Sequence, residues 1–181
     1  MSQRKKKNTN TASKDLAYML VAGGEQAVSE LYEAVRSTLR PFGKLESRRA
    51  NEFAGLEAEL EQHKTLRDTR LLAEARDMLA GVFAKGGFVR VPRDQFPEAW
   101  AKADVAIYDD GPEREEALGT LELRHGVRLQ EVLARAYQRI AKDLEFHETR
   151  IAALERRRRE FLEDYEALRA IRARVTPEVE P

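Results

Sequence analysis

Two histidines give this 181-residue sequence its most sharply defined polar pair. The pairing register of two long predicted helices places His63 beside His147 and Glu52 beside Arg158. Two imidazoles can bind a metal ion or titrate near neutral pH. Two ligands are an incomplete metal site, however, so we interpret His63, His147, Glu52 and Arg158 as a structural polar layer that fixes the register of the helices.

Carboxylates gather in a second candidate region, between residues 85 and 125. Clustered carboxylates bind Mg²⁺ or Ca²⁺ in many proteins. These lack the ligand spacing of an EF-hand, and we interpret them as a solvated acidic loop without a metal. The acids are Asp104, Asp109, Asp110, Glu113, Glu115, Glu116 and Glu122.

The same region alternates aromatic and basic residues, a composition that can stack on and clamp single-stranded nucleic acid. A subdomain of this size also needs its aromatic side chains as a hydrophobic core, and we favour that role for them. The alternating residues are Phe88, Arg90, Arg93, Phe96, Trp100, Lys102 and Tyr108. We predict an interaction surface at the tip of the molecule, formed by Arg90, Arg93, Trp100, Asp109 and Asp110.

The amino terminus holds a strongly basic segment, although the formal net charge of the chain is zero. Residues 1–14 contain five cations and no acid: Arg4, Lys5, Lys6, Lys7 and Lys14. Such a tail attracts nucleic-acid phosphates in a salt-dependent way, and it also occurs as a simple solubilising end. Both interpretations remain open.

Sequence motifs for catalysis are absent. The chain has no cysteine, which excludes disulfides, thiolate metal sites and a cysteine nucleophile. It also lacks the nucleophile elbow, the phosphate loop, the dinucleotide fingerprint and the zinc-protease motif. We therefore expect no enzyme and no cofactor. No apolar stretch is long enough to span a membrane, and residues 1–13 lack the apolar core of a signal peptide, so we expect a cytoplasmic protein with no membrane partner.

The secondary-structure elements that must position these residues are predicted to be mostly helices. We predict helices at about 14–39, 45–84 and 127–174, with breaks at Pro41 and at Gly86 and Gly87. Between the long helices the sequence pattern changes, and it predicts strands at 88–91, 105–108 and 120–124, with a short helix near Trp100. The predicted organisation is a disordered basic tail (1–13), an N-terminal helix and first long helix (14–84), a small α+β insert (85–125), a second long helix (126–174) and an acidic tail (175–181).

Steps of four and three residues along the last helix define a coiled-coil seam. The seam positions are Leu133, Tyr137, Ile140, Leu144, His147, Ile151, Leu154, Arg158, Phe161, Tyr165, Leu168 and Arg172. An antiparallel hairpin then pairs Leu79 with Val132, Leu71 with Ile140, Leu60 with Ile151, Leu56 with Leu154, and Leu45 with Tyr165. The predicted fold is mainly α: a long antiparallel helical hairpin (coiled coil), with an extra N-terminal helix at its base and a small α+β insert at its tip.

This architecture favours a non-enzymatic interaction protein, a scaffold or adaptor that presents its tip to a protein partner or associates with copies of itself. The alternative is a nucleic-acid-associated accessory factor that uses the basic tail. A third hypothesis is a metal-dependent enzyme built on the acidic tip.

Overall fold

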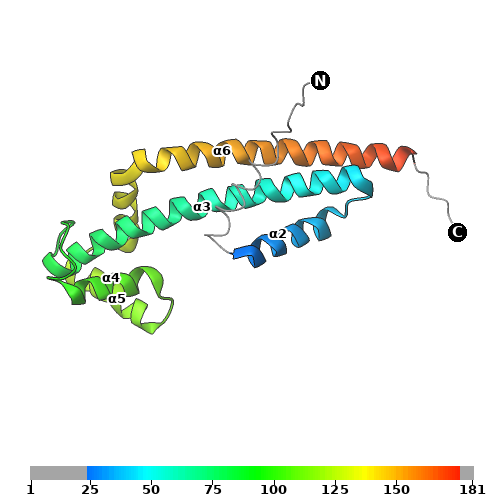
Figure 1. Cartoon of the computed structure of the whole chain (residues 1–181). Coiled ribbons are helices and arrows are strands. Elements are labelled where there is room, and N and C mark those ends of the chain that lie inside the picture. Colours follow the sequence, from blue (N-terminus) through cyan, green and yellow to red (C-terminus); the bar gives the residue numbers. More distant parts are fainter. Residues whose placement is uncertain (1–23, 176–181) are drawn as a thin grey trace, which may run out of the picture. The chain divides into compact units, whose positions relative to one another are not determined.

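The computed structural model describes residues 24–175, and these form five α-helices and no strands (Figure 1). The mainly helical fold class is therefore confirmed. The helices are α2 (Gly24–Leu39), α3 (Gly43–Lys85), α4 (Pro97–Tyr108), α5 (Pro112–His125) and α6 (Leu129–Val175). The predicted basic tail, the predicted helical residues 14–23 and residues 176–181 of the predicted acidic tail lie outside the described residues.

Helix ends follow the local chemistry of proline and glycine. α2 ends at Leu39, before Pro41, whose ring disfavours a helical conformation in the residue that precedes it. α3 ends at Lys85, and Gly86 follows with a φ of +70°, a left-handed conformation that glycine adopts readily at a helix end. These breaks agree with the sequence pattern.

The predicted strands are wrong. Residues 88–91 lie in the α3–α4 connection, 105–108 form the last turn of α4, and 120–124 belong to α5. In α4 the buried side chains are Ala99, Trp100, Ala103 and Ala106, which repeat at helical spacing. Packing of this face outweighs the β-propensity of the β-branched residues nearby, because strand preference depends on having a neighbouring strand. The segment predicted as an α+β insert is therefore helical.

The chain divides into two compact units. Of the described residues, the first contains 24–65 and 148–175, and the second contains Leu66–His147. In the first unit α3 and α6 run antiparallel: Leu56, Leu60, Ile151 and Leu154 share one cluster, and Phe53 stacks obliquely on Phe161 at 4.9 Å between ring centroids. α2 covers this pair, and its residues Val35 and Leu39 pack with Phe53 and Tyr165.

The register predicted at one position of the first unit is wrong. Leu45 was expected to face Tyr165, but its side chain is 60% exposed. Tyr165 instead packs under α2 and donates a hydrogen bond to the Leu39 carbonyl oxygen at 3.3 Å. α2 therefore covers the position that a two-helix pattern assigned to Leu45.

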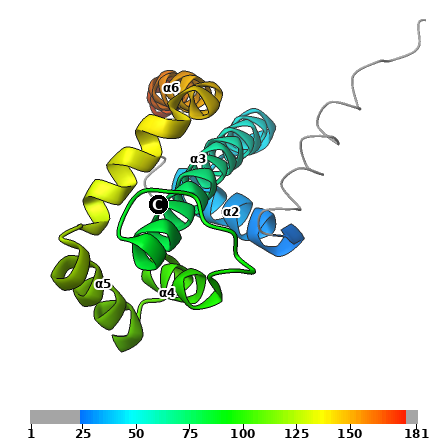
Figure 2. The same cartoon turned by 90° about the vertical axis from the view of Figure 1, so that its left-hand side faces the viewer.

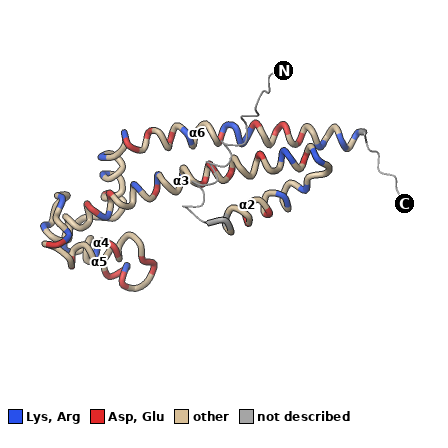
Figure 3. Tube along the Cα trace, in the orientation of Figure 1, with Lys and Arg blue, Asp and Glu red and all other residues tan. Residues whose placement is uncertain are grey.

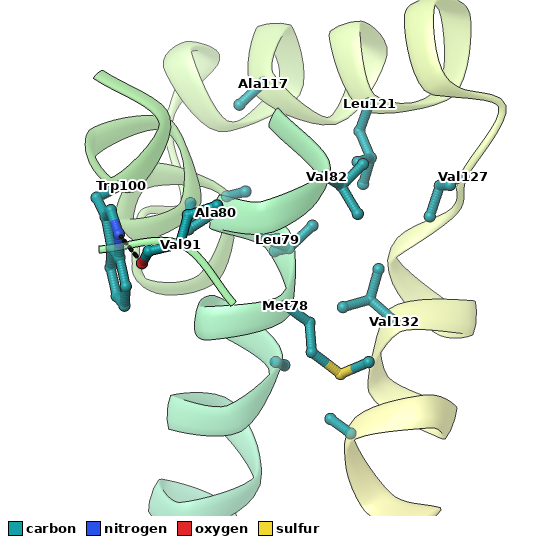
Figure 4. Packing of buried hydrophobic residues seen from close by; sticks show 14 residues of the cluster. Met78, Leu79, Ala80, Val82, Val91, Trp100, Ala117, Leu121, Val127 and Val132 are labelled. Atoms are coloured by element: carbon teal, nitrogen blue, oxygen red, sulfur yellow. Dashed lines mark hydrogen bonds between the residues drawn. The ribbon is translucent and has the colours of Figure 1, made fainter. Parts of the chain in front are cut away.

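In the second unit, the end of α3, helices α4 and α5 and the start of α6 surround the largest hydrophobic cluster (Figures 2 and 4). Leu79, Val82, Leu121 and Val132 are fully buried in it. Antiparallel contact between α3 and α6 is also present here, since Arg70 binds the Asp143 carbonyl oxygen and Glu74 binds Arg139. Within residues 24–175, no helix has the length and apolar character that a membrane span requires.

Candidate functional site

The α3–α4 connection, residues 86–96, lies directly on α3 because Gly81 has no side chain. A Cβ atom at Gly81 would be 1.9 Å from the Val89 carbonyl oxygen and 3.0 Å from the Gly87 carbonyl oxygen. On another side, the Arg135 guanidinium of α6 lies 4.4 Å from the centroid of the Phe88 ring. These two contacts fix the position of the connection on α3, and they therefore also fix the positions of its residues.

Glu74 of α3 also binds this connection, through Arg90. Its side chain is only 8% exposed, and its two carboxylate oxygens bind Arg90 and Arg139, each at 3.0 Å. A buried carboxylate requires such partners, because an unpaired charge away from water is costly. The role of Glu74 was not predicted from the sequence, although an acid within the apolar stripe of Leu71, Ala75 and Met78 was a usable signal.

Trp100 holds the other end of the connection. Its indole Nε1 donates a hydrogen bond to the Val91 carbonyl oxygen at 3.3 Å (Figure 4). The guanidinium carbons of Arg76 and Arg93 lie 5.0 Å and 5.6 Å from the indole centroid, within the range of a cation–π contact. Arg93 also binds Asp104 at 3.1 Å.

These contacts leave a fixed but accessible surface, which we call the arginine surface: Val89, Arg90 and Arg93. The side chains of Arg90 and Arg93 are 70% and 66% exposed, and Val89 is 47% exposed. Each guanidinium is held by one carboxylate and keeps further N–H groups for a ligand. Arg90 and Arg93 can therefore bind carboxylates of a partner, and Val89 beside them can make an apolar contact with it.

The structure separates the members of the predicted tip surface. Trp100 is 9% exposed and supports the connection from below, so its predicted place on the surface is wrong, because the small second unit needs the indole in its core. Arg90 and Arg93 belong to the arginine surface. Asp109 and Asp110 are exposed in the turn between α4 and α5.

The predicted polar layer differs from the observed ion pairs. Arg158 was expected beside Glu52, but it pairs with Glu57. Glu52 pairs within its own helix, with Arg48 at 3.3 Å and Arg49 at 3.1 Å. Arg48 and Arg49 lie four and three residues from Glu52 on the same helix, so its carboxylate pairs with them and not with Arg158 of α6. His63 and His147 fall in different units, and the predicted pairing of the two stays a prediction.

His63 is partly buried in the first unit, and burial lowers the pKa of its imidazole below 6.5. The Arg150 guanidinium lowers this pKa further, while the Glu59 carboxylate opposes the shift. His147 is 6% exposed. Among the described residues, no group of three or more His, Asp or Glu side chains is arranged to hold a metal ion.

A buried ionic cluster at the α2–α3 turn was also not predicted. Glu46 is 3% exposed; its carboxylate accepts a hydrogen bond from the Phe42 N–H at 2.7 Å and pairs with Arg172 of α6 at 2.9 Å. Arg172 also lies over the Phe42 ring at 5.5 Å. Burial, followed by the Glu46 carboxylate, raises the pKa of Tyr165. The acid in the first turn after Pro41 was the available sequence signal.

The predicted nucleic-acid contacts Arg4, Lys5, Lys6, Lys7 and Lys14 lie outside the described residues. Comparison with known proteins adds no relative: no family model, no curated protein and no solved structure matches this chain.

Proposed function

We propose that the chain is a non-enzymatic interaction protein whose second unit presents the arginine surface to an acidic segment of a protein partner. The observation that carries this proposal is the fixed yet exposed state of Arg90 and Arg93. Arginine is enriched among the residues that dominate protein–protein binding energies, and a side chain that is already held loses less entropy on binding.

We also propose that α3 and α6 pair as an antiparallel coiled-coil hairpin closed within one chain. The shared cluster of Leu56, Leu60, Ile151 and Leu154 supports it in the first unit. Cysteines placed at exposed positions beside Leu56 and Leu154 are expected to cross-link within a single chain. Cross-links formed only between chains would contradict the closed hairpin.

The binding role is tested by comparative capture with the full chain as bait. Arg90→Gln with Arg93→Gln removes two exposed cations, while the buried Glu74 keeps its contact with Arg139. The control, Lys102→Gln with Arg124→Gln, removes two exposed cations of the same unit that form no ion pair among the described residues. Melting temperatures of both variants establish that they are folded.

Some proteins should be recovered from the source cells by both the wild-type chain and the control variant. We expect the arginine variant to recover these proteins in amounts lower by about tenfold or more. Equal recovery by the arginine variant, with its melting temperature unchanged, would overturn the assignment of this surface.

A further inference from the structure

One end of the first unit combines exposed apolar side chains with a high density of cations. Phe42, Leu45 and Ile171 are 74%, 60% and 60% exposed. Phe42 lies in the turn between α2 and α3, Leu45 in the first turn of α3, and Ile171 near the end of α6. Arg172 of α6 binds Glu46 of α3 at the same place. Exposed apolar groups rimmed by polar residues mark interaction sites.

We call this region the basic end, and its charge is strongly one-sided (Figure 3). Residues 40–49 and 167–175 contain seven cations and a single acid, the buried Glu46. Within residues 24–175, four of these cations form no ion pair: Arg40, Lys44, Arg169 and Arg174. The surface therefore fits a partner that is acidic and offers some apolar area.

The same chain carries a surface of that kind in its second unit, which we call the acidic turn (108–116). Tyr108 is 53% exposed. Five exposed carboxylates follow it, and none forms an ion pair within the part of the chain that the structure describes: Asp109, Asp110, Glu113, Glu115 and Glu116. Arg114, the one cation of the turn, donates its Nε–H to the Ala106 carbonyl oxygen.

We propose that the acidic turn of one copy docks on the basic end of a second copy. The unpaired carboxylates meet the unpaired guanidinium groups, which bind carboxylates with matching planar geometry. Tyr108 supplies apolar contact for Phe42, Leu45 and Ile171. Two of these three are aliphatic and cannot stack on bases, so the apolar part of the surface favours a protein over a nucleic acid.

Such a contact joins two different surfaces, so it is heterologous. Each copy keeps one free basic end and one free acidic turn, and the assembly grows head to tail until a ring closes or a filament forms. The inference goes beyond the proposed partner surface at Arg90 and Arg93 and uses none of its residues. Loss of self-association therefore leaves the proposed function standing, and loss of partner capture leaves this inference standing.

Charge reversal on each surface tests the contact. The basic-end variant is Arg169→Glu with Arg174→Glu, and the acidic-turn variant is Asp109→Lys with Asp110→Lys. The control, Arg156→Glu with Arg157→Glu, makes the same charge change on α6 at exposed residues that form no ion pair within residues 24–175. Sedimentation velocity of the full chains is measured over a concentration series at about 50 mM and about 500 mM salt.

We expect the wild-type chain and the control variant to associate at low salt and to dissociate at high salt, since salt screens exposed charges over about 10 Å at 0.1 M and over less at higher concentration. Each surface variant alone is expected to weaken association by about tenfold or more. Mixing the two variants is expected to restore it, because every reversed surface then meets a reversed partner.

A wild-type chain that stays monomeric at all concentrations at low salt would overturn the proposal. Failure of the mixed variants to associate would also overturn it, as would an equal loss in the control. Binding of anionic vesicles and of single-stranded DNA to the wild-type chain tests for the other possible occupants of the basic end. If the chain does not self-associate but binds either probe, and the basic-end variant loses this binding, the surface is assigned to lipid or nucleic acid instead.

Discussion

Replacing Gly81 by alanine is expected to destabilise the second unit, although alanine is the better helix former. Alanine in a helix interior gains about 1 kcal/mol over glycine. At Gly81 the new Cβ atom would lie 1.9 Å from the Val89 carbonyl oxygen, whereas real Cβ contacts are not found below 3.0 Å. The connection must therefore move by about 1.1 Å, the difference between these two distances.

That movement acts on a connection with several attachments. Val91 is 5% exposed, and its carbonyl oxygen accepts the Trp100 hydrogen bond. Overpacking costs about 1–3 kcal/mol, and an unsatisfied buried donor costs a further amount of about 1–3 kcal/mol. After subtraction of the helix-propensity gain, we expect the free energy of unfolding to fall by about 1–5 kcal/mol.

Gly119→Ala is the matched control, because a Cβ atom at Gly119 in α5 has no neighbour within 4 Å. This substitution is expected to stabilise the chain by about 0.5–1 kcal/mol. Urea unfolding followed by helical circular dichroism gives the free energies. Fluorescence of Trp100, the single tryptophan, reports on the second unit alone. A Gly81→Ala chain as stable as wild type, with unchanged Trp100 emission, would refute the close approach of the connection to α3.

The remaining predictions concern the first unit and the tail. Since burial lowers the pKa of His63 below 6.5, the unfolded chain binds its proton more readily, and the stability that neutral His63 contributes above pH 6.5 is lost as pH falls through the folded pKa. In urea titrations, His63→Gln should therefore lose less stability than wild type between pH 7.5 and 5; equal losses would contradict this sign. Glu46→Ala removes the partner of Arg172 and of a backbone N–H, so it should cost about 1–3 kcal/mol, while Glu52→Ala, which removes only exposed ion pairs, should cost less than about 1 kcal/mol. Similar melting temperatures for these two variants would argue against the buried ionic cluster. If the tail contacts nucleic acid, alanines at residues 4–7 should remove the salt-dependent part of DNA binding in a filter or anisotropy assay, and binding unaffected by these alanines would exclude a role for the tail.

Most of the helical architecture could be predicted from the sequence, because it depends on local and periodic signals. Pro41 and Gly86 end helices through backbone restrictions that need no tertiary context. The repeat along α6 identified buried positions such as Leu144, Ile151 and Leu154, since apolar side chains at this spacing lie on one face. The lack of cysteine is a property of composition alone, and it excludes disulfides and thiolate chemistry whatever fold the chain adopts.

Tertiary structure alone decided the local structure of the segment between the long helices, because its residues have mixed preferences. Val105 and its β-branched neighbours pair with no strand, and the alanine face of α4 packs against the core instead. The tertiary structure also determines which charged side chains pair. The buried Glu74 binds Arg90, the buried Glu46 binds Arg172, and Arg158 pairs with Glu57. Ion pairing depends on distances of a few ångströms between side chains far apart in the sequence, and no spacing rule along one helix determines them.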